Sequence, residues 1–197
     1  LKDGRSKYRR CFTEGHYLAW LLGQISPERS VVFIGYSFGA LITLEALEDL
    51  VAAENVGRQV SPWQHRPGDT RLIFVAPAVR CDAFSPYGKY RETLACVDRV
   101  SLTINSQDDA LRFFRFLDPR TQVDAIGYTG MPRRWMPTEI GYSAIDARNI
   151  IGREHGLTLY MRSNTLMRRI CCEAYGGLET LSHETILKKS QKYQNVK

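Results

Sequence analysis

A short strand-like run that leads directly into a glycine-flanked serine limits the folds open to this chain more than any other segment. Val31-Val32-Phe33-Ile34 is a continuous β-branched and aromatic run, typical of a strand covered on both faces in a parallel sheet. Gly35-Tyr36-Ser37-Phe38-Gly39 follows at once, and leucines at helical spacing then predict a helix over Ala40–Asn55. Ser37 is therefore expected at a tight turn between a strand and a helix.

Other strand-like and helix-like segments alternate along the rest of the chain. The expected elements are, in chain order, a helix over 6–25, the strand over 31–34, the helix over 40–55, a strand over 72–76, a short helix over 90–96, a strand over 99–104, a helix over 110–117, a strand over 138–145 and a helix over 164–175. This alternation predicts an α/β fold, with about four mostly parallel strands between two helical layers.

Length and composition fit one folded domain. The chain has 197 residues, of which 44% are hydrophobic and 11% aromatic, which excludes a disordered or fibrous protein. We expect a single domain over residues 1–187 and a polar tail over 188–197. No stretch reaches the roughly twenty apolar residues that a membrane-spanning helix needs, so no transmembrane segment is expected.

The charge and the cysteine content limit the kinds of partner and metal site that this chain can have. The formal net charge of +6 is spread along the sequence, which favours a solvated basic surface over a nucleic-acid site. The five cysteines are an odd number without C-x-x-C spacing, which argues against a disulfide framework or a zinc site. Reduced, buried thiols are the simpler interpretation, and they suggest a cytoplasmic setting.

The serine at the turn has the surroundings of a nucleophile. A turn this tight strains the backbone of Ser37, and we expect Gly35 and Gly39 to supply room because neither has a Cβ. The Ser37 hydroxyl then lies at the N-terminus of a helix, where free N–H groups stabilise negative charge. The N–H of Phe38 is the expected oxyanion donor; a Gly-Ser turn without chemistry is the alternative.

A nucleophilic serine needs a histidine base and an acid that orients it. His155 lies in a predicted loop before the last helix, although an exposed loop histidine without a role has the same appearance. Asp109 follows the strand over 99–104 and is the expected acid, with Asp108 and Asp146 as alternatives. The alternative for Asp108 and Asp109 is an aspartate pair that only caps the following helix.

Three segments carry a resemblance to the α/β-hydrolases. Val31 to Ala40 resembles their nucleophile elbow, Ser106 to Leu111 their acid loop, and Arg153 to Tyr160 their histidine loop. The resemblance covers the chain from about Ser6 to Ile170. The elbow is its specific part, and the acid and histidine loops resemble those of bacterial lipase- or esterase-like members. It implies the order serine, acid, histidine, which His16 and His65 do not fit.

The resemblance also implies a function and a gap. It implies hydrolysis of a small-molecule or lipid-like ester through Ser37, Asp109 and His155, with no metal and no organic cofactor. It further implies strands before the elbow and a second oxyanion donor that this sequence lacks, so the chain is expected to be the C-terminal part of the fold. A truncated or degenerate binding module without activity is the alternative function.

The substrate is not specified by these motifs, and the oligomeric state stays open. Two segments, 85–90 and 128–136, are candidates to cover Ser37. Their large side chains either line an apolar substrate pocket or cover the core: Tyr87, Tyr90, Tyr128, Trp135 and Met136.

Overall fold

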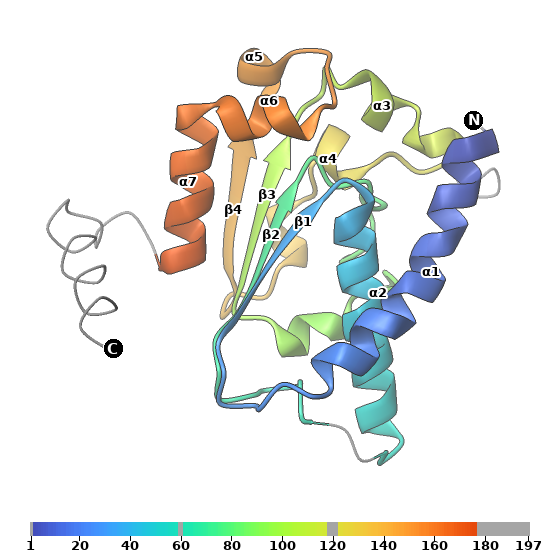
Figure 1. Cartoon of the computed structure of the whole chain (residues 1–197), viewed down its shortest axis with the longest axis vertical. Helices are drawn as coiled ribbons and strands as arrows, with labels where there is room; N and C mark the ends of the chain where they lie inside the picture. Colours follow the sequence, from blue (N-terminus) through green and yellow to red (C-terminus); the bar gives the residue numbers. More distant parts are fainter. Residues whose placement is uncertain (1, 59–60, 118–121, 177–197) are drawn as a thin grey trace, which may run out of the picture.

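A computed structural model describes residues 2–58, 61–117 and 122–176 (Figure 1). The boundary expected at residue 187 and the tail over 188–197 lie outside the described residues, as does the fourth histidine of the chain, His183.

Four strands form one sheet in which every neighbouring pair is parallel. The strands are β1 (Val31–Tyr36), β2 (Thr70–Val75), β3 (Arg99–Ile104) and β4 (Gly141–Asp146), and they lie in the order β1-β2-β3-β4. The predicted α/β fold with about four strands is confirmed. Because all strands run the same way, their carboxyl ends meet at one edge of the sheet.

Three long helices flank the sheet, and shorter helices fill the connections. The long ones are α1 (Lys2–Leu22), α2 (Phe38–Asn55) and α7 (Asn164–Tyr175). The short α-helices are α3 (Asp109–Arg112), α4 (Ile126–Thr129), α5 (Arg148–Ile151) and α6 (Leu157–Arg162), and the 3-10 helices are η1 (Glu92–Cys96), η2 (Phe114–Phe116) and η3 (Arg133–Trp135). The helix expected over 110–117 is in fact the two short pieces α3 and η2.

The core consists of two layers, one on each face of the sheet. Alternate side chains of β2 point to opposite faces: Leu72 and Phe74 pack with the leucines of α2, whereas Ile73 packs with Leu166 and Ile170 of α7. Figure 1 shows α1 and α2 on one side of the sheet and α7 on the other. Helix α1 packs along α2 as an outer helix of the first layer.

Strand β1 is the edge of the sheet and is covered on one face only. Phe33 packs toward the α2 layer, but Val32 is 41% exposed and Ile34 60% exposed on the other face. Among the described residues, no strand pairs with the outer edge of β1. None of the helices described is both long and apolar enough to cross a membrane.

Candidate active site

Ser37 lies in a strained turn between β1 and α2. Its φ of 52° and ψ of −118° are unusual for a residue with a side chain. The turn is fixed by its own backbone: the Ser37 N–H donates to the Val75 carbonyl at 3.0 Å, and the Ser37 carbonyl accepts from Ala78 N–H at 3.1 Å. Neighbouring β2 therefore holds the serine at the carboxyl edge of the sheet.

The two glycines beside the serine differ in the room they provide. A Cβ on Gly35 would lie 2.8 Å from the Ala40 nitrogen and 2.9 Å from the Ala40 Cα, both backbone atoms. A Cβ on Gly39 would meet nothing within 4 Å. The close approach that requires a glycine is thus at Gly35, and the expectation that Gly39 also supplies room is wrong.

Ser37, His155 and Asp108 form a continuous line of hydrogen bonds. The Ser37 Oγ lies 2.8 Å from His155 Nε2, and His155 Nδ1 lies 2.7 Å from Asp108 Oδ2. The Asp108 side chain is fully buried, and that of His155 is 23% exposed. Since an ionised carboxylate can only accept, the Nδ1 proton belongs to the histidine, which leaves Nε2 free to accept from the serine hydroxyl.

The expected acid, Asp109, is not the residue that contacts the histidine. Its carboxylate accepts from the Arg153 guanidinium at 3.0 Å on the surface. The third candidate, Asp146, pairs with Arg148 at 2.7 Å and is exposed. Asp108 instead precedes the first turn of α3, where one oxygen accepts from Leu111 N–H at 2.9 Å and the other faces His155. The assignment of Asp109 is therefore corrected to its neighbour.

The loops that carry the acid and the histidine are tied to each other. Buried Asn105, directly after β3, donates from Nδ2 to the Gly152 carbonyl at 2.7 Å and accepts from Gln107 N–H at 3.0 Å. The Asp109 N–H donates to the Arg153 carbonyl at 3.1 Å. These bonds fix the distance between the segment after β3, which carries Asp108, and the segment after α5, which carries His155. No local sequence pattern marks Asn105, because its partner Gly152 is 47 residues away.

Tyr36 holds the histidine loop from the side of β1. Its hydroxyl donates to the His155 carbonyl, and its ring centroid lies 5.3 Å from the imidazole. Burial, and secondarily the charge of Asp108, raises the pKa of Tyr36. The hydroxyl therefore keeps its proton and remains a donor. Tyr36 was quoted in the sequence pattern but was not assigned a role.

Helix α2 begins beside the serine and offers a donor for negative charge. Phe38 is the first residue of α2, so its N–H has no acceptor within the helix. The positive end of the helix dipole adds to the effect. This position agrees with the oxyanion donor expected from the sequence. We assign no second donor among the described residues.

An apolar pocket opens next to Ser37 and His155. It encloses about 300 Å³, and its lining comprises Gly4, Ser37, Phe38, Ala78, Ala110, Leu111, Phe113, Phe114, Leu117 and His155. None of the five large side chains expected over the serine lies in this lining. Tyr90 is buried against Glu45, Met136 belongs to the core, and Tyr87 is fully exposed. The pocket is built instead by the segment after β3 and the start of α1.

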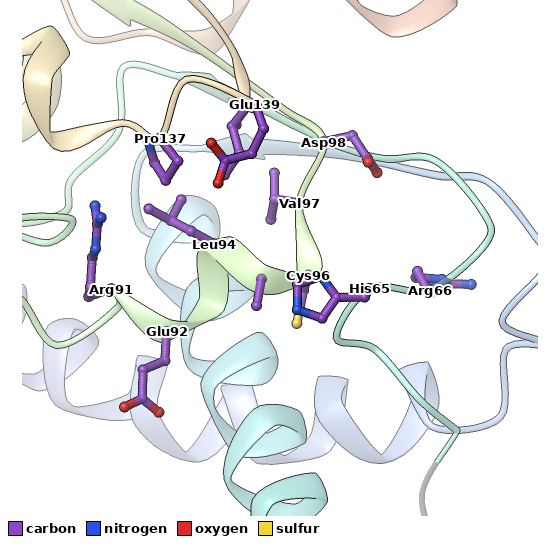
Figure 2. A pocket seen from close by; sticks show the side chains of 12 residues that line it. His65, Arg66, Arg91, Glu92, Leu94, Cys96, Val97, Asp98, Pro137 and Glu139 are labelled. Atoms are coloured by element: carbon purple, nitrogen blue, oxygen red, sulfur yellow. The ribbon is translucent and has the colours of Figure 1, made fainter.

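A second pocket, of about 370 Å³, lies at the end of the sheet where the strands begin, opposite the end that carries Ser37 (Figure 2). Its lining includes His65, Cys96 and Asp98, which precede or flank the amino ends of the strands. Figure 2 shows Arg91 and Arg66 at opposite ends, and neither points toward a common centre. Arg66 instead donates to the carbonyls of Ser26 and Arg29 in a neighbouring turn.

The other two histidines that the structure describes have different surroundings. His16 contacts Asp49 on the surface between α1 and α2, and His65 lines the second pocket. In the described part of the chain, no three His, Cys, Asp or Glu side chains form a group that could hold a metal ion. Only one of the histidines described thus meets both a serine and an aspartate.

Comparisons with known proteins add no relative. No protein-family model, no curated protein and no solved structure matches this chain. The geometry of the site is therefore the basis on which a function can be assigned.

Proposed function

We propose that the chain is a serine hydrolase that cleaves a carboxylic ester through Ser37, His155 and Asp108. The single observation that carries this proposal is the unbroken line from the Ser37 hydroxyl through the imidazole to a fully buried carboxylate, with contacts of 2.8 and 2.7 Å. A serine hydroxyl becomes a nucleophile when a positioned base accepts its proton. The α/β-hydrolase relationship implied by the sequence remains part of this proposal.

The first half of the reaction would form an acyl-enzyme. Ser37 Oγ attacks the ester carbonyl carbon as His155 Nε2 takes the hydroxyl proton, and the carbonyl oxygen becomes an oxyanion beside the Phe38 N–H. The tetrahedral intermediate then collapses: the C–O bond to the alcohol breaks, and His155 returns the proton to the leaving oxygen. Asp108 stabilises the imidazolium and keeps the ring oriented throughout.

The second half would repeat these steps with water. His155 takes a proton from water as its oxygen attacks the acyl carbon, and the proton then passes to Ser37 Oγ as the carboxylic acid is released. The balance is one ester and one water to one acid and one alcohol. The residues present can perform each proton transfer.

Labelling with a small fluorophosphonate tests the proposal directly. The probe should phosphonylate Ser37, and mass spectrometry should locate the adduct on the peptide that contains Gly35 to Gly39. Ser37→Ala and His155→Ala should abolish labelling, whereas Ser106→Ala, at an exposed serine of the acid loop, should retain it. Circular dichroism of each variant controls for folding.

The opposite result would favour the other candidate function, a hydrolase-like binding module without activity. The observation behind that candidate is that only one oxyanion donor is assigned, because loss of one donor costs roughly 100- to 1000-fold in kcat. A folded chain that does not label at Ser37 would refute the enzyme and leave this alternative.

A further inference from the structure

The pocket beside Ser37 has a chemical character that selects among esters. Apart from Ser37 and His155, the described residues of its lining are glycine and apolar residues, and no lysine, arginine, aspartate or glutamate is among them. A charged group placed there would lose its hydration without a partner, which is costly. The pocket therefore suits a hydrocarbon group and disfavours a charged one.

Gly4 of α1 and Leu117, which follows η2, lie next to each other in the lining of the pocket. A Cβ on Gly4 would lie 3.1 Å from Cδ2 of Leu117, and both residues line the pocket. Glycine within a helix costs about 1 kcal/mol relative to alanine, and Gly4 lies in the first turns of α1. Its missing side chain leaves space that any larger residue would take from the pocket.

The size of the pocket limits what it can hold. A volume of about 300 Å³ lies at the lower end of the range of small-molecule sites. Phe113, which lines the pocket, is 54% exposed and contacts Phe116, which is 42% exposed, with ring centroids 6.1 Å apart. A flexible hydrocarbon of medium length would fill a pocket of this volume.

We infer that this pocket binds the uncharged hydrocarbon group of the ester, and that Gly4 and Leu117 set the length it accepts. The inference depends on the proposed function, because it names the substrate of the same serine. It makes Gly4 and Leu117 specificity-determining residues with no part in the proton transfers.

The test is a chain-length profile of kcat/KM. The probes are p-nitrophenyl esters from acetate to dodecanoate, which vary the acyl group, and a parallel series of alkyl acetates, which varies the alcohol. Each methylene that enters the pocket should raise kcat/KM about fourfold, from about 0.8 kcal/mol per buried methylene. The series that shows this rise identifies the half of the ester that the pocket takes.

Variants at Gly4 and Leu117 should change the chain-length profile of kcat/KM in opposite directions. Gly4→Leu should lower kcat/KM for the preferred long ester by at least tenfold and leave acetate within about twofold. Leu117→Ala should move the optimum to a longer chain. Ser6→Leu adds the same side chain to an exposed position of the same helix and should behave as the wild type.

A charged isostere completes the test. The monosuccinate p-nitrophenyl ester has a similar length to the pentanoate but ends in a carboxylate, so its kcat/KM should fall well below that of the pentanoate. The inference would be overturned if kcat/KM did not change with chain length in either series, or if it were equal for the charged and uncharged esters. In that case, fluorophosphonate labelling at Ser37 would still support the proposed hydrolase. Absence of labelling in the folded wild type would overturn both.

Discussion

Asp108 and Asp109 are neighbours at the start of α3, yet their carboxylates meet different partners. Asp108 is buried and faces His155, whereas Asp109 is 43% exposed and pairs with Arg153. Side chains of consecutive residues at a helix start point in different directions. A single position in the sequence thus separates a positioned acid from a surface ion pair.

Substituting the two aspartates in turn should separate their roles. Asp108→Asn keeps the shape of the side chain but removes the charge that orients and stabilises the imidazolium, so kcat should fall by roughly 10⁴-fold. Asp109→Asn removes a surface ion pair, which contributes about 0–1 kcal/mol to stability, and should leave kcat near the wild-type value. Steady-state hydrolysis of the preferred p-nitrophenyl ester provides the measurement. A larger loss in Asp109→Asn would reverse our assignment.

The sequence predicted the serine and histidine of the site but not which aspartate completes it. Ser37 is marked by its glycines and by the strand before it, and His155 is one of four histidines in the chain. The choice between adjacent aspartates depends on one backbone angle: Asp108 is extended, with ψ of 111°, and precedes the helix. The bonds of Asn105 and Tyr36 to the histidine loop join residues 47 and 119 positions apart, which local patterns do not reveal.

At the level of elements, long segments were predictable and single turns were not. The strand over 99–104 and the helix over 164–175 match β3 and α7. The strand alternates polar and apolar residues over its whole length, and the helix repeats apolar residues over several turns. Helices α4 and α5 have four residues each, too few to show helical periodicity. The helix expected over 110–117 divides at Phe113, where α3 gives way to η2.

The junction of β1 and α2 should be sensitive to one glycine and tolerant at the other. Gly35→Ala forces a Cβ against the backbone of Ala40 at 2.8 to 2.9 Å. Overpacking of this kind typically costs 1–3 kcal/mol, so we expect the free energy of unfolding to fall by about 3 kcal/mol. Gly39→Ala meets open space and replaces a helical glycine, so stability should rise by up to about 1 kcal/mol.

Urea denaturation of the two variants checks this pair. The midpoint should fall in Gly35→Ala and stay or rise in Gly39→Ala, with unchanged m-values. Equal destabilisation would mean that both glycines are required by the turn, as the sequence pattern alone suggested.

Across the whole molecule, the sheet separates two cores, and the sequence predicts which residues lie in them only in part. The continuous apolar run of β2 predicts burial on both faces, and Leu72 and Ile73 do lie in different cores. The run of β1 predicts the same, but Val32 and Ile34 are exposed. A local pattern reports how apolar a strand is, whereas its exposure depends on which elements lie beside it.

The first core contains two thiols whose protons are tied to folding. Cys11 lies on α1 against α2, and Cys96 lies at the end of η1; both are buried. Burial raises the pKa of Cys11 to about 11 and that of Cys96 to about 12. The folded chain therefore retains protons that the unfolded chain releases above about pH 9.

This difference sets the sign of the alkaline response. Since the unfolded state binds fewer protons than the folded state above about pH 9, the free energy of unfolding must fall as pH rises toward 11 or 12. Each buried thiol contributes a slope of up to about 1.4 kcal/mol per pH unit. The contribution is fully present below pH 9 and is lost as pH passes through the pKa of the folded state.

Denaturant unfolding between pH 8 and 11, with a reductant present, should show this slope and its origin. Cys96→Ala lowers stability at pH 8 because it leaves a small cavity, but its decline with pH should be shallower than that of the wild type by about 1.4 kcal/mol per unit. Cys171→Ala, at an exposed position of α7, should keep the wild-type slope. If the free energy of unfolding of Cys96→Ala fell as steeply with pH as that of the wild type, the Cys96 thiol would not be the source of the alkaline destabilisation.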